Sequence, residues 1–154
     1  MRTKTLGIGG LILIAAAAVC FAANPTEGTW KLNESKSTFG DGAGKSTTVV
    51  WTKTGHEHKC TVDGTDADGK KSHTVWTGKL DGKDYPITGD DQSDTRSFKT
   101  NGENSLDMVS KKGGKIVGEG KIAVAPDRKT RTVTSTITNA KGAKVTSTLF
   151  YDKS

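Results

Sequence analysis

The stretch RTVTSTITNAKGAKVTSTLFY, residues 131–151, decides the fold. Its first part alternates, with Val133 and Ile137 on one side and threonines on the other. A turn follows at Lys141-Gly142, after which Leu149 and Tyr151 again share one side. Alternation with period two, interrupted by a glycine turn, is typical of a β-hairpin with one buried face. The sequence therefore predicts two antiparallel strands here.

The same pattern of short Thr- and Val-rich runs between turns extends back to the start of the domain. No window repeats its apolar positions at helical spacing, and only Glu34–Ser37 could form a short helical turn. Apolar-faced strands hide their edges only by closing or by stacking two sheets, and consecutive short turns favour closure. We therefore expect an all-β, up-and-down antiparallel β-barrel of about 8–10 strands. The predicted strands are Thr29–Leu32, Ser46–Lys53, His56–Asp63, Lys70–Lys79, Lys83–Thr88, Thr95–Thr100, Ser105–Lys111, Lys115–Ala125, Arg131–Asn139 and Lys144–Tyr151.

The first 23 residues have the pattern of a signal peptide. Arg2 and Lys4 precede an apolar run, Leu6–Phe21, that is too short and wrongly flanked for a membrane span. Small residues at 22 and 23 suit signal peptidase. We expect a signal peptide over 1–23, a single barrel domain over 24–154, and a periplasmic or secreted product with no stable membrane span after processing. Two alternatives are a lipoprotein attached through Cys20 and an uncleaved anchor.

Charge and cysteine content restrict the partners. Without Arg2 and Lys4 the chain has 21 basic and 17 acidic residues, a net charge of +4 spread along the sequence. A nucleic-acid-binding protein needs a basic stripe with interleaved aromatics, so we expect no nucleic-acid partner. Cys60 is the one cysteine left after processing, which excludes an intramolecular disulfide and favours a buried apolar role for it.

Two segments resemble a known superfamily. Gly28-Thr29-Trp30-Lys31-Leu32 resembles the opening strand of the calycin superfamily, which comprises the lipocalins and the fatty-acid-binding proteins, and Thr148–Lys153 resembles the closing strand of the latter. Nearly all of 24–154 is similar to small exported bacterial lipocalin-like proteins. The resemblance implies a ligand-binding barrel in which Gly28 and Trp30 are structural and the tryptophan caps one end.

The chain also departs from these relatives. Fatty-acid-binding proteins place an arginine two residues before the tyrosine of the last strand, where the pair binds a carboxylate. Leu149 occupies that position ahead of Tyr151. The segment 33–44 has no room for their helical lid. We therefore expect weak binding of free fatty acids.

His56, His58 and Cys60 form the sharpest candidate metal site. Alternation places all three on one face of a strand, and imidazole and thiolate are good ligands for zinc or copper. Neighbouring positions on that face are about 7 Å apart, so one ion would need the strand to bend. A three-residue turn at Ala67-Asp68-Gly69 would pair Cys60 with Trp76 and turn His73 outward. We expect no metal here and no cofactor.

Other motifs fit loops better than active sites. The segment 40–47 lacks the spacing and the following helix of a phosphate-binding loop. Asp63, Asp66 and Asp68 lack the closing glutamate of a calcium loop, and turn chemistry explains them. No nucleophile elbow or paired His-Glu motif is present. We therefore expect a protein that is not an enzyme.

The remaining candidates are interior side chains that could line a cavity or simply fill it. The residues expected to contact a ligand are Trp51, Trp76, Met108, Leu149 and Tyr151. The first hypothesis is that a small, mostly apolar molecule binds inside the barrel. The alternative is a filled barrel acting through its outside, as an envelope structural module or a protein-interaction or inhibitor module.

Overall fold

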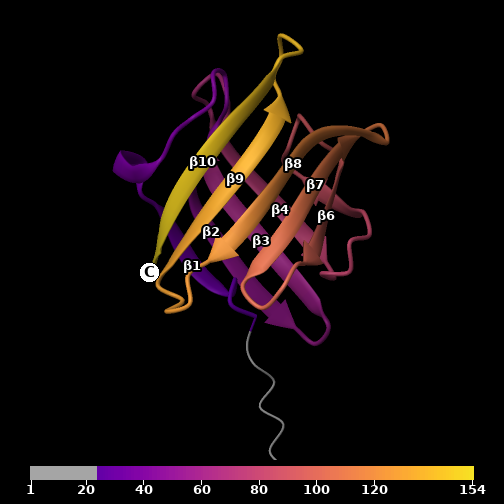
Figure 1. Cartoon of the computed structure of the whole chain (residues 1–154). Helices are drawn as coiled ribbons and strands as arrows, with labels where there is room; N and C mark the ends of the chain where they lie inside the picture. Colours follow the sequence, from indigo (N-terminus) through magenta and orange to yellow (C-terminus); the bar gives the residue numbers. More distant parts are fainter. Residues whose placement is uncertain (1–23) are drawn as a thin grey trace, which may run out of the picture.

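The chain folds into a closed antiparallel barrel of ten strands, seen in a computed structural model that describes residues 24–154 (Figure 1). Each strand pairs with the next along the chain, and β1 closes the barrel by pairing with both β2 and β10. The predicted up-and-down barrel is confirmed. The strands are β1 (Gly28–Leu32), β2 (Lys45–Thr54), β3 (Glu57–Thr65), β4 (Lys71–Gly78), β5 (Tyr85–Thr88), β6 (Thr95–Thr100), β7 (Ser105–Lys112), β8 (Lys115–Val124), β9 (Thr130–Thr138) and β10 (Lys144–Lys153).

The tight connections follow from the glycine turns in the sequence. Gly69, for example, has φ of 79°, a left-handed conformation that glycine adopts without steric cost. Asp66 completes this turn by accepting hydrogen bonds from the N–H groups of Asp68 and Lys70, each at 2.9 Å. This turn pairs Cys60 with Trp76, as its length predicts.

The first connection is longer and lies partly outside the barrel. A single 3₁₀ turn, η1 (Glu34–Lys36), follows β1, at the predicted place. The chain then crosses β10, where Thr38 and Thr148 form an isolated bridge with backbone bonds of 2.8 and 2.9 Å. The segment does not enter the barrel as a helical lid.

The two ends of the barrel differ (Figure 1). One end, which we call the aromatic end, is covered by the segment Asn24–Glu27 and holds the tryptophans. The other, which we call the loop end, carries the connection 33–44, the β5–β6 loop 89–94 and the β9–β10 turn. The buried apolar core consists of Trp30, Val49, Trp51, Cys60, Trp76, Ile87, Phe98, Leu106, Ile122, Val124, Leu149 and Tyr151.

Two glycines on the inner face of β8 allow the sheet to close tightly. A Cβ on Gly120 would lie 2.8 Å from the carbonyl oxygen of Thr134 and 3.0 Å from Cε of Met108. Gly118 is similarly covered by Ile137, whose Cγ2 would lie 3.3 Å away. The two glycines thus allow a close approach of the neighbouring strands and leave one wall of the interior without side-chain bulk.

β5 is the shortest strand of the barrel, with four residues. It registers with β4 through two residue pairs and with β6 through two more. The prediction of a strand over Lys83–Thr88 was therefore two residues too long, because residues 83 and 84 belong to the β4–β5 connection. β5 is the least supported part of the barrel wall.

The predicted signal peptide, residues 1–23, lies outside the described residues. Among residues 24–154, no helix is long and apolar enough to cross a membrane.

Candidate ligand-binding site in the barrel interior

Four aromatic rings fill the aromatic end. Phe98 packs edge-on against Trp51, with ring centroids 5.0 Å apart, and against Trp76, at 4.7 Å. Tyr85 meets Trp76 at 5.9 Å in the same edge-to-face geometry. Such pairs contribute about 0.5–1.5 kcal/mol beyond the area that they bury. The rings therefore pack against one another and fill this end of the interior, so they do not line an open cavity.

The five side chains expected to contact a ligand all lie on inner-face positions. Trp51, Trp76, Leu149 and Tyr151 are buried, and Met108 is partly buried. Trp76 is held by its indole N–H, which donates to the carbonyl oxygen of Arg96 at 2.8 Å. Placement inside the barrel agrees with the alternation, while the role of these residues as ligand contacts stays a prediction.

Gly28 and Trp30 lie in β1, beside the strand that closes the barrel. Trp30 is fully buried, and its indole N–H donates to the carbonyl oxygen of Thr26 at 2.8 Å. Gly28 has φ of 118°, and a Cβ there would lie 2.7 Å from Cε of Lys153. The ammonium of Lys153 in turn lies 5.2 Å from the Trp30 ring centroid. These contacts close the seam between β1 and β10.

Toward the loop end the inner face carries smaller side chains. Along β9 and β10, Val133 faces Leu149 and Ser135 faces Ser147 across the ladder. On the neighbouring wall Met108 lies over Gly120. Val133, Ser135 and Met108 are only partly buried, in contrast to the rings below them. The inner face of this half is therefore more accessible to solvent than the aromatic end.

An arginine near the start of β9 points into the barrel. Arg131 on β9 is 2% exposed and is directly opposite Tyr151 on β10. Its guanidinium lies between two rings, 4.8 Å from the centroid of Trp30 and 4.8 Å from that of Tyr151. Its Nε and Nη1 are buried and have no hydrogen-bond partner among the described residues. Buried charges in proteins are normally paired, so this side chain is exceptional.

The arginine also affects the groups around it. Burial lowers the pKa of Arg131 to about 10, which leaves it charged at neutral pH. Burial raises the pKa of Tyr151 to about 12, and the phenol donates to the carbonyl oxygen of Ser46 at 2.9 Å. Burial likewise raises the pKa of Cys60 to about 12, so its thiol is neutral and unreactive. The interior thus contains an unpaired positive charge beside neutral hydroxyl and thiol groups.

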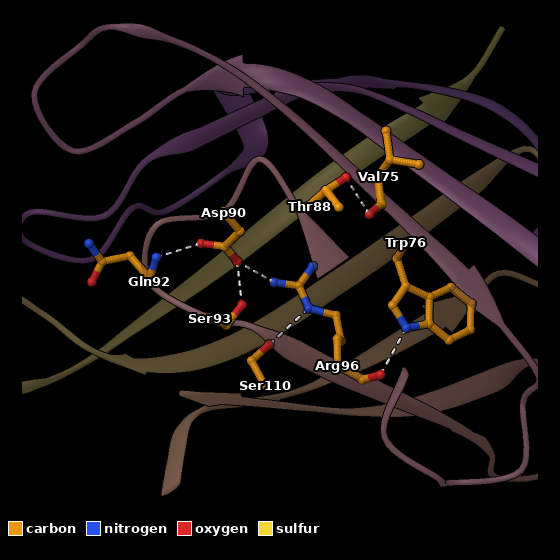
Figure 2. Close-up of polar contacts among 8 residues, drawn as sticks. All are labelled: Val75, Trp76, Thr88, Asp90, Gln92, Ser93, Arg96 and Ser110. Atoms are coloured by element: carbon orange, nitrogen blue, oxygen red, sulfur yellow. Dashed lines mark hydrogen bonds and ion pairs between the residues drawn. The ribbon is translucent and has the colours of Figure 1, made fainter. Parts of the chain in front are cut away.

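A second inward arginine is paired, as Figure 2 shows. Arg96 on β6 donates from Nη2 to Oδ2 of Asp90 at 3.1 Å and from Nε to Oγ of Ser110 at 2.8 Å. Asp90 belongs to the β5–β6 loop and also accepts from the hydroxyl of Ser93 and the backbone N–H of Gln92. The Asp90 and Arg96 side chains are 16% and 18% exposed, so this ion pair is largely buried.

Sequence analysis missed both arginines, although the alternation contains them. Arg131 has the same parity as Val133 and Ile137, and Arg96 has the same parity as Phe98. An arginine on the apolar face of a strand is the signal, because the period of two leaves it no other direction. Both arginines were overlooked because only apolar side chains were considered as interior candidates.

The structure does not assemble a metal site from His56, His58 and Cys60. His58 and Cys60 are buried on β3, but His56 is exposed in the preceding turn. No group of three potential ligands gathers anywhere in residues 24–154. The physical reason is spacing: side chains two positions apart on one strand face are about 7 Å apart, and His56 lies before the start of β3. His73 points outward, with Nδ1 2.6 Å from Oδ1 of Asp63, as the turn length predicts.

Two hollows lie away from the interior. One, of about 530 Å³, is on the outside of β8 and β9, between Lys121, Thr134 and Thr136 and their neighbours. The other, of about 340 Å³, is at the aromatic end, where Asn24–Thr26 meet His58, Lys53 and Leu106. None of the five predicted ligand contacts lines either hollow.

The comparisons with known proteins give the fold. No family model matches the chain, and no curated protein is significantly similar in sequence. Among solved structures, the S-type phycobiliprotein lyase CPES from Guillardia theta matches at a TM-score of 0.54 with 12% identity, covering 84% of this chain and 89% of that one. EF1p2_mFAP2b bound to DFHBI matches at 0.50 with 11% identity, covering 84% and 94%. Zebrafish ileal bile acid-binding protein with cholic acid matches at 0.49 with 9% identity, covering 84% and 99%.

The chain shares a closed antiparallel barrel architecture with the first two of these structures. At these identities the likeness extends to the architecture, and the function has to be argued from this chain's own interior.

Proposed function

We propose that this chain is a non-enzymatic barrel that binds a small, mostly apolar molecule carrying one anionic group. The apolar part would lie toward the loop end, over Met108 and Val133, and the anion would pair with Arg131. Solved barrels of the same fold support the idea that such an interior can hold a small molecule, since EF1p2_mFAP2b binds DFHBI.

The observation that carries the proposal is the buried guanidinium with two unpartnered nitrogens. A charge at this depth costs several kcal/mol unless something compensates it. The two flanking rings offset part of that cost, at about 0.5–2 kcal/mol each. A carboxylate or similar anion would supply the missing acceptors. Because Leu149 replaces the carboxylate-binding arginine of fatty-acid-binding proteins, the sequence predicts weak binding of free fatty acids. Arg131, which lies opposite Tyr151 on the adjacent strand, could supply that arginine, so we propose that the carboxylate is bound after all.

The test is displacement of a fluorescent fatty-acid analogue by an aliphatic acid and by its matched alcohol. We expect the acid to compete at least tenfold better than the alcohol for the wild-type chain. Arg131→Met should abolish that preference, whereas Arg128→Met should keep it, because Arg128 is an exposed arginine in the β8–β9 turn. Equal competition by acid and alcohol in the wild type would contradict an anionic ligand.

A pair of adjacent substitutions tests the position of the apolar part. Met108 points inward and Val109, the next residue of β7, points outward. Met108→Arg should abolish binding of the analogue, and Val109→Arg should leave it unchanged. Loss of binding in both variants, with the fold intact by circular dichroism, would place the ligand outside the barrel.

A second candidate function is favoured by the outer hollow on β8 and β9. In this reading the filled barrel acts through its surface, as a structural or protein-interaction module. Thr134→Arg would place a bulky charge in that hollow and should disrupt an outer contact while leaving dye binding inside the barrel intact.

Export is part of the proposal. The apolar run before residue 24 supports removal of residues 1–22 or 1–23 and release into a periplasm or the medium. The mass of the intact protein purified from that compartment measures the cleavage point. Recovery of the full chain from membranes would favour an anchor, and a lipid-modified Cys20 would favour a lipoprotein.

A further inference from the structure

The wall around β5 has little backbone pairing. β5 shares two register pairs with β4 and two with β6, and the loop that follows it, residues 89–94, lies at the loop end. Backbone bonds hold the last residue of the loop, because the carbonyl oxygen of Asp94 accepts from Ile87 at 3.1 Å and its N–H donates to Lys111 at 2.9 Å. Segments with few such bonds are the ones that open locally without unfolding the whole domain.

A buried carboxylate holds the rest of the loop against the inner face of the barrel (Figure 2). Asp90 accepts from Nη2 of Arg96 at 3.1 Å, from the N–H of Gln92 at 2.9 Å and from the hydroxyl of Ser93. Nε of Arg96 donates to Oγ of Ser110, which is 6% exposed on the inner face of β7. The ion pair therefore joins the loop to the interior side of the wall, and closure of the loop depends on it.

Arg96 and Arg131 lie near the same interior thiol. Burial raises the pKa of Cys60, and the positive charges of Arg131 and Arg96 both oppose that rise. Charge effects fall off with distance, so both guanidiniums are close to this residue of β3. Arg96 contacts the loop end through Asp90, whereas Arg131 lies near the start of β9, toward the aromatic end. An anion that enters at the loop end therefore approaches Arg96 before Arg131.

We propose that the β5–β6 loop closes an entrance to the barrel interior and opens when an entering anion takes the place of Asp90 on Arg96. The exchange replaces one carboxylate with another, so the guanidinium stays paired throughout. A neutral molecule offers Arg96 no counter-ion, and the entrance therefore selects anions. This inference rests on the proposed interior site for its natural ligand and adds the route by which that ligand enters.

The buried tryptophans report opening without any ligand. Trp30, Trp51 and Trp76 are at most 2% exposed, and Trp76 lies opposite Ile87 of β5. Its indole N–H donates to the carbonyl oxygen of Arg96 at 2.8 Å. Separation of β5 and its loop from the wall uncovers Trp76, so quenching of tryptophan fluorescence by acrylamide, a neutral solute, measures the opening.

Asp90→Asn removes the counter-ion, and Asp91→Asn is the matched control because Asp91 is the exposed next residue. We expect the acrylamide quenching constant to rise about threefold or more in Asp90→Asn and to stay at the wild-type value in Asp91→Asn. Circular dichroism checks the fold of each variant. Ser93→Ala keeps the ion pair and removes one donor to Asp90, so it should show a smaller rise and replaces Asp90→Asn if that variant does not fold.

Iodide and caesium ions, compared at equal ionic strength, test the selection of anions. Once Asp90 is neutral, Arg96 is the unpaired charge at the opening, so quenching by iodide should increase more than quenching by caesium. Three results would overturn the proposal: unchanged acrylamide quenching in both Asp90→Asn and Ser93→Ala, an equal rise in Asp91→Asn, or no greater increase for iodide than for caesium.

Binding rates separate this inference from the proposed function. A barrier to passage slows entry and exit alike, so Asp90→Asn should raise the association and dissociation rate constants of the fluorescent fatty-acid analogue by similar factors, measured by stopped flow. Asp91→Asn should change neither rate constant. Binding with wild-type rates in Asp90→Asn would overturn the entrance and leave the interior site standing. If the wild type does not bind the analogue, the proposed function fails and the quenching results alone decide the entrance.

Discussion

At the scale of single residues, Arg131 is the point where the barrel departs from an apolar interior. Its burial between Trp30 and Tyr151 is partly offset by cation–π contacts, but two of its nitrogens lack acceptors. A hydrophobic side chain of similar length would avoid that cost. A residue retained against stability is a mark of function, because binding sites are often less stable than the alternatives that would fill them.

Replacement of this arginine should therefore stabilise the protein without ligand. We expect Arg131→Met to raise the free energy of unfolding by about 1 kcal/mol, since the lost desolvation cost exceeds the lost cation–π energy. Urea denaturation followed by tryptophan fluorescence measures the change. A loss of stability of similar size would mean that Arg131 serves the packing of Trp30 and Tyr151 rather than a ligand.

His58 makes a second residue-scale prediction, for pH. Burial lowers its pKa in the folded protein below the ordinary value of 6.5, so the unfolded chain binds more protons as the pH falls through that range. The stabilising contribution of the neutral ring is complete above about pH 6.5 and is lost as the pH falls through the lowered folded-state pKa.

Thermal unfolding between pH 7.5 and about pH 5 tests this sign. The melting temperature should fall on acidification in the wild type, and the fall should be smaller in His58→Asn than in His56→Asn, whose side chain is exposed. An identical fall in the two variants would show that other groups cause it.

At the scale of elements, β5 and its loop depend on side chains more than on the ladder. β5 has two register pairs on each side, whereas β9 and β10 share nine. The β5–β6 loop is held instead by Asp90 on Arg96 and by Asp94, whose carboxylate accepts from the N–H of Gly113 at 2.8 Å. The buried ion pair therefore helps to hold β5 in the barrel wall, a role that backbone pairing fills for the other strands.

Removing the charge of Asp90 should open this part of the wall. Asp90→Asn leaves Arg96 without a counter-ion, and loss of one partner of a buried pair costs about 3–5 kcal/mol. Hydrogen exchange measures the consequence, and the amide of Ile87, which donates to Asp94 at 3.1 Å, should lose protection first. The β9–β10 amides should keep theirs until global unfolding. Uniform loss of protection would mean that β5 is no weaker than the other strands.

At the scale of the whole molecule, closure makes every strand depend on two neighbours. β1 joins β2 to β10, so chain segments more than a hundred residues apart complete one sheet. The buried tryptophans come from three different strands and pack within one core. We therefore expect residues 24–154 to unfold as one cooperative unit.

The prediction can be checked with two probes. Denaturation followed by tryptophan fluorescence, which reports the core, and by far-ultraviolet circular dichroism, which reports the strands, should give coincident transitions. Separate midpoints would show that part of the sheet opens without the core.

The strands, the turns and the inner and outer faces could all be predicted from the amino-acid pattern. Those features are local, because alternation such as that of Val133 and Ile137 and a glycine turn such as Lys141-Gly142 act within a few residues. Which side chains the inner faces contact became known only from the assembled barrel. Whether Trp51 lines a cavity or packs in a filled core depends on Trp76 and Phe98, which come from other strands. Whether Arg131 has a hydrogen-bond acceptor depends on side chains that are distant in the sequence. The packing of the interior and the pairing of its buried charges depend on residues from several strands, and the periodicity within one strand does not encode them.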